Sequence, residues 1–354
     1  MEILKEMPRR DPLNGTFELT VRCNLKCKMC LFRHDDSENK EIMAKEKTAE
    51  EWIDMARQVA EAGTINLLIT GGEPMLRPDF CEIYEEIYKM GFIITLYTNA
   101  TLVTPKIMDV LKKYPPHKIG VTLYGACEET YKKVCGVSAY EKTISGIQEL
   151  SKLPSMLEIR STLIKDNIMD LDSMYKIVED KFGKDVPFCT SRIVLKPVRG
   201  GTCDVESCRL TPKDNVELLF KKTKEVIKDF GLASDDDSIK FKFEDKESSS
   251  FRPTIYGCDA GMSSYTITWD GKLIGCQMLD DTWVSPFKDG FNKSWQLFPT
   301  KVVYKELNEK CKNCKDKMLC STCVATRMAE TGDISGCPKY ICEDVKEMKK
   351  YLIL

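Results

Sequence analysis

The sequence predicts an α/β fold, a partial (β/α)6 barrel followed by a small cysteine-rich domain. From residue 16 to about 195, short β-branched segments alternate with amphipathic helical segments, which is the pattern of βα units around a parallel sheet. A polar stretch follows, and cysteines then become frequent. The length of 354 residues suffices for one large domain and a smaller one.

Six segments are expected to form the strands of a TIM-like partial barrel. In such folds, active-site residues gather at the carboxyl ends of the strands. The expected strands are Phe17 to Val21, Ile65 to Thr70, Phe92 to Tyr97, Ile119 to Leu123, Leu157 to Leu163 and Phe188 to Leu195.

The helices between these strands carry their own start and stop signals. Thr48 and Glu51 form a capping box before a helix that ends near Gly63. Asp79 and Glu82 repeat this pattern before the next helix. One more helix is expected over Thr211 to Phe230. The predicted organisation is therefore a barrel over 14–230, a linker over 231–254 and a cysteine-rich domain over 255–345.

Charge and hydropathy exclude several classes of partner. The formal net charge is -2, with acidic and basic residues interspersed, so no nucleic-acid-binding patch is expected. No apolar run approaches the length of a membrane span, so no membrane partner is expected, and the predicted location is the cytoplasm. In that reducing compartment, the seventeen cysteines favour metal ligation over disulfides.

Three cysteines, Cys23, Cys27 and Cys30, follow the first expected strand within eight residues. A four-iron cluster normally takes four cysteines, so three leave one iron with an open coordination site. The alternative, structural zinc, needs four ligands that are usually split into two distant pairs. A disulfide framework would need an export signal, which the sequence does not show.

The CxxxCxxC spacing resembles the signature of the radical S-adenosylmethionine (SAM) enzymes. This resemblance implies that the open iron of a [4Fe-4S] cluster chelates SAM and that reductive cleavage releases a 5′-deoxyadenosyl radical. Met29 stands where the family often has an aromatic residue, and it is apolar and adaptable. The resemblance assigns Met29 to the cofactor site.

The second expected strand ends in Gly71-Gly72-Glu73-Pro74. Adjacent glycines allow close backbone approach, and proline fixes the turn. This turn opens on the same end of the sheet as the cysteine loop. It resembles the family's motif for holding the methionyl amino group of SAM, with Glu73 as the acceptor.

Later strand ends carry further positions that resemble cofactor contacts in the family. The resemblance assigns Thr98, Asn99, Thr122 and Arg160 to the SAM site. Tyr124 stands where many relatives have an acidic residue, so no carboxylate role is carried over to it. His34 and His117 are the only histidines, and no catalytic acid or base is assigned.

Eight cysteines of the terminal region resemble the SPASM extension of radical SAM enzymes that modify peptides. The spacing departs from that pattern only between Cys320 and Cys323, which are separated by two residues instead of three. The resemblance implies a distal cluster on Cys311, Cys314, Cys320 and Cys342, and a nearer one on Cys258, Cys276 and Cys323, with Cys337 as a candidate fourth ligand. A pair of zinc sites is the alternative. Strand-like segments on both sides of Asp270-Gly271 predict a hairpin that sets Cys258 near Cys276.

The predicted protein is a radical SAM/SPASM enzyme with three [4Fe-4S] clusters that oxidatively modifies a ribosomally made peptide, for example by a thioether or carbon–carbon crosslink. The resemblance implies a flavodoxin or ferredoxin-type reductant. The barrel begins close to the amino terminus, so a separate leader-binding protein is an expected partner. The alternatives are a sulfatase-maturing, tetrapyrrole-oxidising or sugar-oxidising relative and, in another class, a non-catalytic electron-transfer or zinc-binding protein.

Overall fold

The computed structural model describes residues 9–229, 241–242, 255–303, 305–320 and 322–353. Its largest element is a curved eight-stranded sheet in the order β6-β5-β4-β3-β2-β1-β8-β9. Strands β1 to β6 are parallel, which confirms the predicted fold. They are β1 (Asn14–Glu18), β2 (Asn66–Thr70), β3 (Ile93–Thr98), β4 (Lys118–Thr122), β5 (Met156–Thr162) and β6 (Phe188–Ser191).

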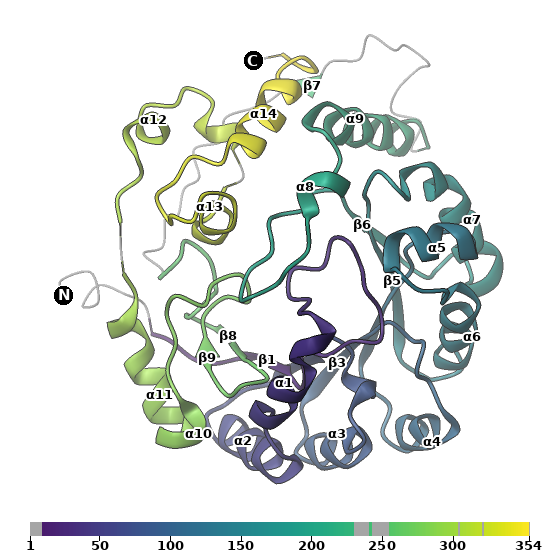
Figure 1. The fold of residues 1–354 in the computed structure, drawn as a ribbon, viewed down its shortest axis with the longest axis vertical. Coiled ribbons are helices and arrows are strands. Elements are labelled where there is room, and N and C mark those ends of the chain that lie inside the picture. The colour runs from purple at the N-terminus through teal and green to yellow at the C-terminus, as the bar shows by residue number, and fades with distance from the viewer. Residues whose placement is uncertain (1–8, 230–240, 243–254, 304, 321, 354) are drawn as a thin grey trace.

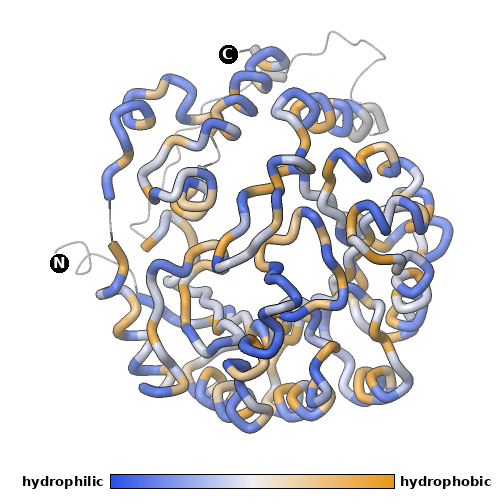
Figure 2. Tube along the Cα trace, in the orientation of Figure 1, coloured by the Kyte–Doolittle hydropathy of each residue, from blue (hydrophilic) through white to orange (hydrophobic). Residues whose placement is uncertain are grey.

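Helices cover the outer face of this sheet, and in Figure 2 hydrophobic and hydrophilic residues alternate along them, as amphipathic helices require. The fully buried Trp52 packs on Phe17 of β1, with ring centroids 5.0 Å apart. The outer helices are α2 (Ala49–Glu61), α3 (Phe80–Lys89), α4 (Pro105–Lys113), α5 (Glu128–Cys135), α6 (Tyr140–Leu150) and α7 (Leu171–Phe182). The short α1 (Asn39–Lys45) lies near the centre of the view in Figure 1.

The two predicted capping boxes have different outcomes. Before α2, the Thr48 hydroxyl accepts from the Glu51 N–H, and the Glu51 carboxylate accepts from the Thr48 N–H at 2.8 Å. The box at Asp79 is wrong, because the Asp79 side chain makes no capping bond. Its carboxylate instead forms an ion pair with Arg77 at 2.6 Å, and this pair replaces the cap.

The hairpin around Gly271 is confirmed as β8 (Ser264–Ile267) and the antiparallel β9 (Leu273–Ile274). Strand β8 also pairs in parallel with β1, from Asn14 opposite Ser264 to Phe17 opposite Ile267. The cysteine-rich region therefore shares one sheet with the barrel.

The remaining elements lie after β6. The helix predicted over 211–230 is present as α9 (Pro212–Asp229). The predicted linker falls almost entirely outside the described residues, apart from β7 (Phe241–Lys242), which pairs with β10 (Leu352–Ile353). The shorter terminal helices are α8 (Val205–Cys208), α10 (Pro286–Asp289), α11 (Phe291–Leu297), α12 (Glu309–Lys312), α13 (Val324–Thr331) and α14 (Lys339–Met348). Among the described residues, none of the helices has the length and apolarity to span a membrane.

Candidate active site

The three-cysteine loop follows β1 and lies against the end of α5. The Lys26 N–H donates to the carbonyl of Cys135 at 2.7 Å, and the Lys28 N–H donates to that of Val134 at 3.0 Å. These bonds hold the loop on both sides of Cys27. All three thiols line a cavity of about 410 Å³ at the carboxyl ends of the strands, a size typical of small-ligand sites.

Burial opposes ionisation of these thiols. It raises the pKa of Cys23, and it raises that of Cys30 to about 12. The pKa of Cys27 is raised first by a hydrogen bond with the neighbouring thiol of Cys135 and then by burial. Thiols in this state become thiolates when they bind a cation, so metal binding here releases protons.

The donor set of three cysteines is of the type that iron–sulfur cubes take. In the described ranges, no three Cys, His, Asp or Glu side chains converge closely enough to hold one metal ion. Cysteines that ligate a cube each bind a different iron, so their sulfur atoms need not meet at one point. The Asn99 amide lies 3.6 Å from the Cys23 sulfur and also donates to Asn24 at 2.9 Å, which ties the loop to the end of β3.

The Gly71-Gly72 pair lets the turn after β2 run directly along the cysteine loop. The Gly72 N–H donates to the Thr20 carbonyl at 2.7 Å, and the Glu73 N–H donates to the Arg22 carbonyl at 2.9 Å. A Cβ atom on Gly71 would clash with the backbone of Thr20, and one on Gly72 would clash with the carbonyl of Arg22. The two glycines therefore allow the turn after β2 to lie close to the backbone of the cysteine loop.

Glu73 is completely buried and does not line the cavity, and neither does Pro74. Its carboxylate accepts hydrogen bonds from the Asn99 N–H at 2.7 Å, the Thr98 hydroxyl at 2.8 Å and the Met75 N–H at 3.0 Å. Burial raises the pKa of Glu73 to about 7, although these bonds act in the opposite direction. The structure thus places Glu73 as a brace between the ends of β2 and β3. Its contact with SAM stays a prediction.

The other predicted cofactor residues do come together around the cavity. Arg160 lies over the ring of Tyr97, 4.6 Å from its centroid, and donates to its hydroxyl. Strand order explains this convergence, because β3, β4 and β5 are neighbours whose carboxyl ends share one edge. The predicted residues that line the cavity are Met29, Gly71, Gly72, Thr98, Asn99, Thr122 and Arg160.

Sequence reasoning missed several residues of the cavity wall. Tyr124, to which the sequence analysis assigns no role, lines the cavity. Cys189 on β6 does so too, together with Arg33 and His34, which follow the cysteine triplet. His34 lies 3.2 Å from the Glu38 carboxylate. Proximity to the cysteine loop is the only sequence signal that could have indicated Arg33 and His34.

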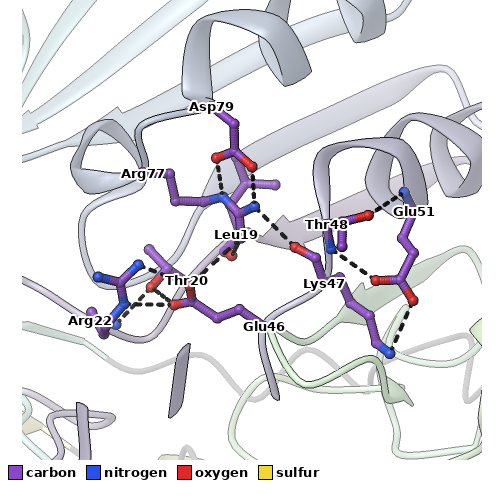
Figure 3. A network of polar contacts seen from close by, with 9 residues as sticks. All are labelled: Leu19, Thr20, Arg22, Glu46, Lys47, Thr48, Glu51, Arg77 and Asp79. Atoms are coloured by element: carbon purple, nitrogen blue, oxygen red, sulfur yellow. Dashed lines mark hydrogen bonds and ion pairs between the residues drawn. The ribbon is translucent and has the colours of Figure 1, made fainter. Parts of the chain in front are cut away.

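A buried polar network, also missed, supports the start of the cysteine loop (Figure 3). Arg77 donates to the carbonyls of Leu19 at 2.9 Å and Lys47 at 3.0 Å, besides its ion pair with Asp79. Arg22 pairs with Glu46 through two bonds of 2.9 Å. The network joins β1, the segment before α2 and the turn before α3.

Six of the eight terminal cysteines are near neighbours of one another, in two sets of three. Cys258 and Cys323 lie within electrostatic range of Cys276, whose pKa is raised first by burial. Cys337 lies 3.3 Å from Cys342, sulfur to sulfur, and hydrogen-bonds with Cys311. Cys337 and Cys342 are neighbours because both lie at the start of α14. The candidate role of Cys337 at the nearer cluster stays a prediction.

Comparison with protein families gives one match within the barrel. Residues 17–177 match the model of the radical SAM superfamily. This range includes the cysteine loop, the glycine turn and the strand ends that line the cavity.

Among individual proteins, the chain is 27% identical over 333 residues to the AdoMet-dependent heme synthase of Methanosarcina barkeri, covering 90% of this chain and 92% of that protein. The structure is similar to that of Streptococcus suis SuiB bound to precursor peptide SuiA, with a TM-score of 0.66 and 16% identity over 96% of this chain and 78% of SuiB. It is also similar to that of native anSMEcpe with bound AdoMet and Cp18Cys peptide, with a TM-score of 0.63 and 20% identity over 96% of both chains. These structural likenesses concern the fold.

Proposed function

Because residues 17–177 are a radical SAM domain, we propose that this protein is a radical SAM enzyme with auxiliary clusters that oxidatively modifies a ribosomally made peptide. One observation carries the proposal: the cysteine loop and the glycine turn open into the same cavity as Thr122 and Arg160. When bound there, the cluster and SAM supply a 5′-deoxyadenosyl radical that abstracts a hydrogen atom.

The residues of this chain would hold and orient these groups. Cys23, Cys27 and Cys30 would ligate the first cluster, and the Asn99 amide lies close enough to donate to the Cys23 sulfur. Arg160 on β5 and Tyr97 on β3 form a pair across β4, suited to an anionic or ribose group of SAM.

Two observations support a peptide as the substrate. The fold extends over 78% of SuiB and 96% of anSMEcpe, two proteins whose structures contain peptides. Six terminal cysteines also lie in two sets of three, which supports a pair of auxiliary clusters. These clusters would accept the surplus electron of an oxidation, and a flavodoxin or ferredoxin-type protein would reduce the first cluster. A separate leader-binding protein completes the proposed set of partners.

A tetrapyrrole substrate is the second candidate. The relative from Methanosarcina barkeri is named a heme synthase, and the alignment with this chain covers 92% of its length. This observation favours tetrapyrrole chemistry. The cavity wall provides Arg33 and Arg160, which suit the carboxylates that tetrapyrroles carry.

The test begins with anaerobic reconstitution and analysis of iron, sulfide and 5′-deoxyadenosine. About twelve irons per chain and SAM cleavage are expected, because eleven cysteines divide into one open and two further clusters. Replacing Cys23, Cys27 and Cys30 together by alanine should remove about four irons and all cleavage. Wild-type protein that yields no 5′-deoxyadenosine would instead be a non-catalytic metal protein.

The substrate is then decided by two parallel incubations. One contains a short peptide encoded beside the gene, and its mass should fall by about two hydrogens per crosslink, since crosslinking removes two hydrogen atoms. The other contains a carboxylated tetrapyrrole, whose visible absorption would change on oxidation. A changed tetrapyrrole with an unchanged peptide contradicts the peptide proposal and supports the second candidate.

A further inference from the structure

His34 lies where three segments of the chain meet. It stands four residues after Cys30 and lines the same cavity as the three thiols of the cysteine loop. Its ring lies edge to face against Trp269, in the turn between β8 and β9, with centroids 6.3 Å apart. A Cβ atom on Gly200, in the segment between β6 and α8, would lie only 2.8 Å from Cε1 of this ring. The imidazole is therefore packed between the barrel and the hairpin of the cysteine-rich region.

Glu38 fixes the orientation of this ring. Its Oε2 atom lies 3.2 Å from Nδ1 of His34, and its Oε1 atom accepts a hydrogen bond of 3.2 Å from the Asp35 N–H. The Asp35 carboxylate in turn accepts from the Ser37 N–H at 2.9 Å, which completes a capping box on a short 3₁₀ turn, Asp36–Glu38. The local backbone thus holds the carboxylate that meets the imidazole.

The contact with Glu38 determines which ring nitrogen can accept a proton. An ionised carboxylate only accepts hydrogen bonds, so Nδ1 of the neutral imidazole carries its hydrogen toward Glu38. Nε2 then keeps its lone pair, and in the part of the chain that the structure describes it has no hydrogen-bond partner. An imidazole with a carboxylate on one nitrogen and a free lone pair on the other has the arrangement of a general base.

The proposed oxidation needs such a base. Formation of a crosslink removes one hydrogen as an atom and a second as a proton and an electron. The auxiliary clusters take the electron in the proposed function, whereas the proton still needs an acceptor. Among the described residues that line the cavity, Asp36 is the one carboxylate, and it forms an ion pair with Lys26. The imidazole of His34 is the better acceptor, since it exchanges protons near neutral pH and its Nε2 is free.

We propose that His34 is the general base of the oxidation, with Nε2 taking the proton that the substrate loses and Glu38 as the positioning residue that holds the ring. The proposal rests on the proposed function. For a thioether crosslink, the 5′-deoxyadenosyl radical takes a hydrogen atom from a peptide carbon, the S–H bond of a peptide thiol breaks and a C–S bond forms. The thiol proton goes to His34 and the surplus electron to an auxiliary iron–sulfur cluster, so atoms and electrons balance.

Charged groups on the elements packed against the imidazole have partners of their own. Arg199, next to the glycine that contacts the ring, makes two hydrogen bonds of 2.7 Å to the carboxylate of Glu18. Asp270, in the hairpin turn, pairs with Lys272 at 3.0 Å. Glu38 is therefore the charged group through which the protein acts directly on the ring.

The test compares the two histidines of the chain. His34→Gln removes the base, whereas His117→Gln changes an exposed histidine that precedes β4 and does not line the cavity. With the short peptide encoded beside the gene, His34→Gln should lower kcat for crosslinking by at least about a hundredfold and leave KM little changed. Iron content and 5′-deoxyadenosine formation should persist, and His117→Gln should match the wild type.

Three further readouts distinguish a base from a merely structural residue. The wild-type crosslinking rate should rise with pH as the imidazole loses its proton, and this limb of the profile should be absent in His34→Gln. Added imidazole should restore product in His34→Ala, because it fits the space that the ring leaves. Peptide affinity, measured by titration calorimetry, should be the same in His34→Gln and the wild type. Glu38→Gln should lower the crosslinking rate by a smaller factor, because the ring remains.

A wild-type crosslinking rate in His34→Gln would overturn the proposal, as would a loss of peptide affinity that accounts for the whole loss of rate. If His34→Gln loses iron, Glu38→Gln still decides, because an unchanged rate and pH profile in that variant would refute the role of the pair. Wild-type protein that cleaves SAM but leaves the peptide unchanged would overturn the proposed function and this role with it, and that outcome is seen before His34 is changed.

Discussion

The carboxylate of Glu73 accepts a hydrogen bond of 2.7 Å from the backbone N–H of Asn99, so the turn after β2 is fastened to the end of β3. The Asn99 side chain in turn reaches the Cys23 sulfur at 3.6 Å. A buried carboxylate that does not line the cavity is thereby connected, through one residue, to the cysteine loop. We therefore expect the protonation state of Glu73 to affect the free energy of unfolding more directly than it affects catalysis.

Glu73→Gln should flatten the pH dependence of stability. The folded pKa is about 7 and the ordinary value is 4.5, so between these values the folded state binds more protons than the unfolded state. The unfolding free energy of the wild type should consequently fall as pH rises through this window, by about 3 kcal/mol. Urea unfolding of the metal-free protein at several pH values between 5 and 8 measures it. A wild-type curve parallel to that of Glu73→Gln would contradict the prediction.

Gly72→Ala should push the turn after β2 away from the backbone of the cysteine loop. The added Cβ would meet the carbonyls of Val21 and Arg22, which cannot move without disturbing Cys23. We expect loss of about four irons per chain and of SAM cleavage. Gly63→Ala is the control, because nothing lies within 4 Å of its Cβ and only the positive φ of 96° is penalised. A Gly72→Ala variant with full iron content and cleavage would show that the close approach is dispensable.

Arg77→Met should destabilise the whole barrel. The change leaves the carbonyls of Leu19 and Lys47 without their donor and the Asp79 carboxylate without its partner (Figure 3). The expected loss is about 3–5 kcal/mol of unfolding free energy, as for other buried pairs that lose one member. Arg57→Met, whose side chain and partner are both more than half exposed, should change stability by less than about 0.5 kcal/mol. Equal effects of the two variants in urea unfolding would refute the importance of the network.

Changing Cys311 and Cys314 to alanine should separate cofactor cleavage from product formation. Cleavage needs only the first cluster and its surroundings, whereas the proposed oxidation also needs the terminal clusters. 5′-Deoxyadenosine should therefore persist while modified product is lost. Circular dichroism and residual iron distinguish this outcome from unfolding, since ligand loss can unfold a small metal domain. Full product yield from a folded variant would show that the distal cluster is unnecessary for turnover.

The local sequence pattern was sufficient to predict the barrel and the positions of its loops. The alternation of strands and helices, the capping box at Thr48 and the hairpin at Gly271 all depend on residues close together in the chain. The spacing of Cys23, Cys27 and Cys30 is also a local feature, because all three lie on one loop. Strand ends could also be assigned to one edge, because parallel strands joined by helices share their direction.

Tertiary structure decided the contacts between distant segments. Pairing of β8 with β1, the inward position of Glu73 and the Glu18–Arg199 pair each join residues that no local period relates. Asp79 is an example: its sequence pattern predicts a helix cap, but in the structure its side chain forms an ion pair with Arg77. The physical reason is that a side chain takes whichever partner lowers the free energy of the folded whole. For buried charges that partner is known only once packing has brought the segments together.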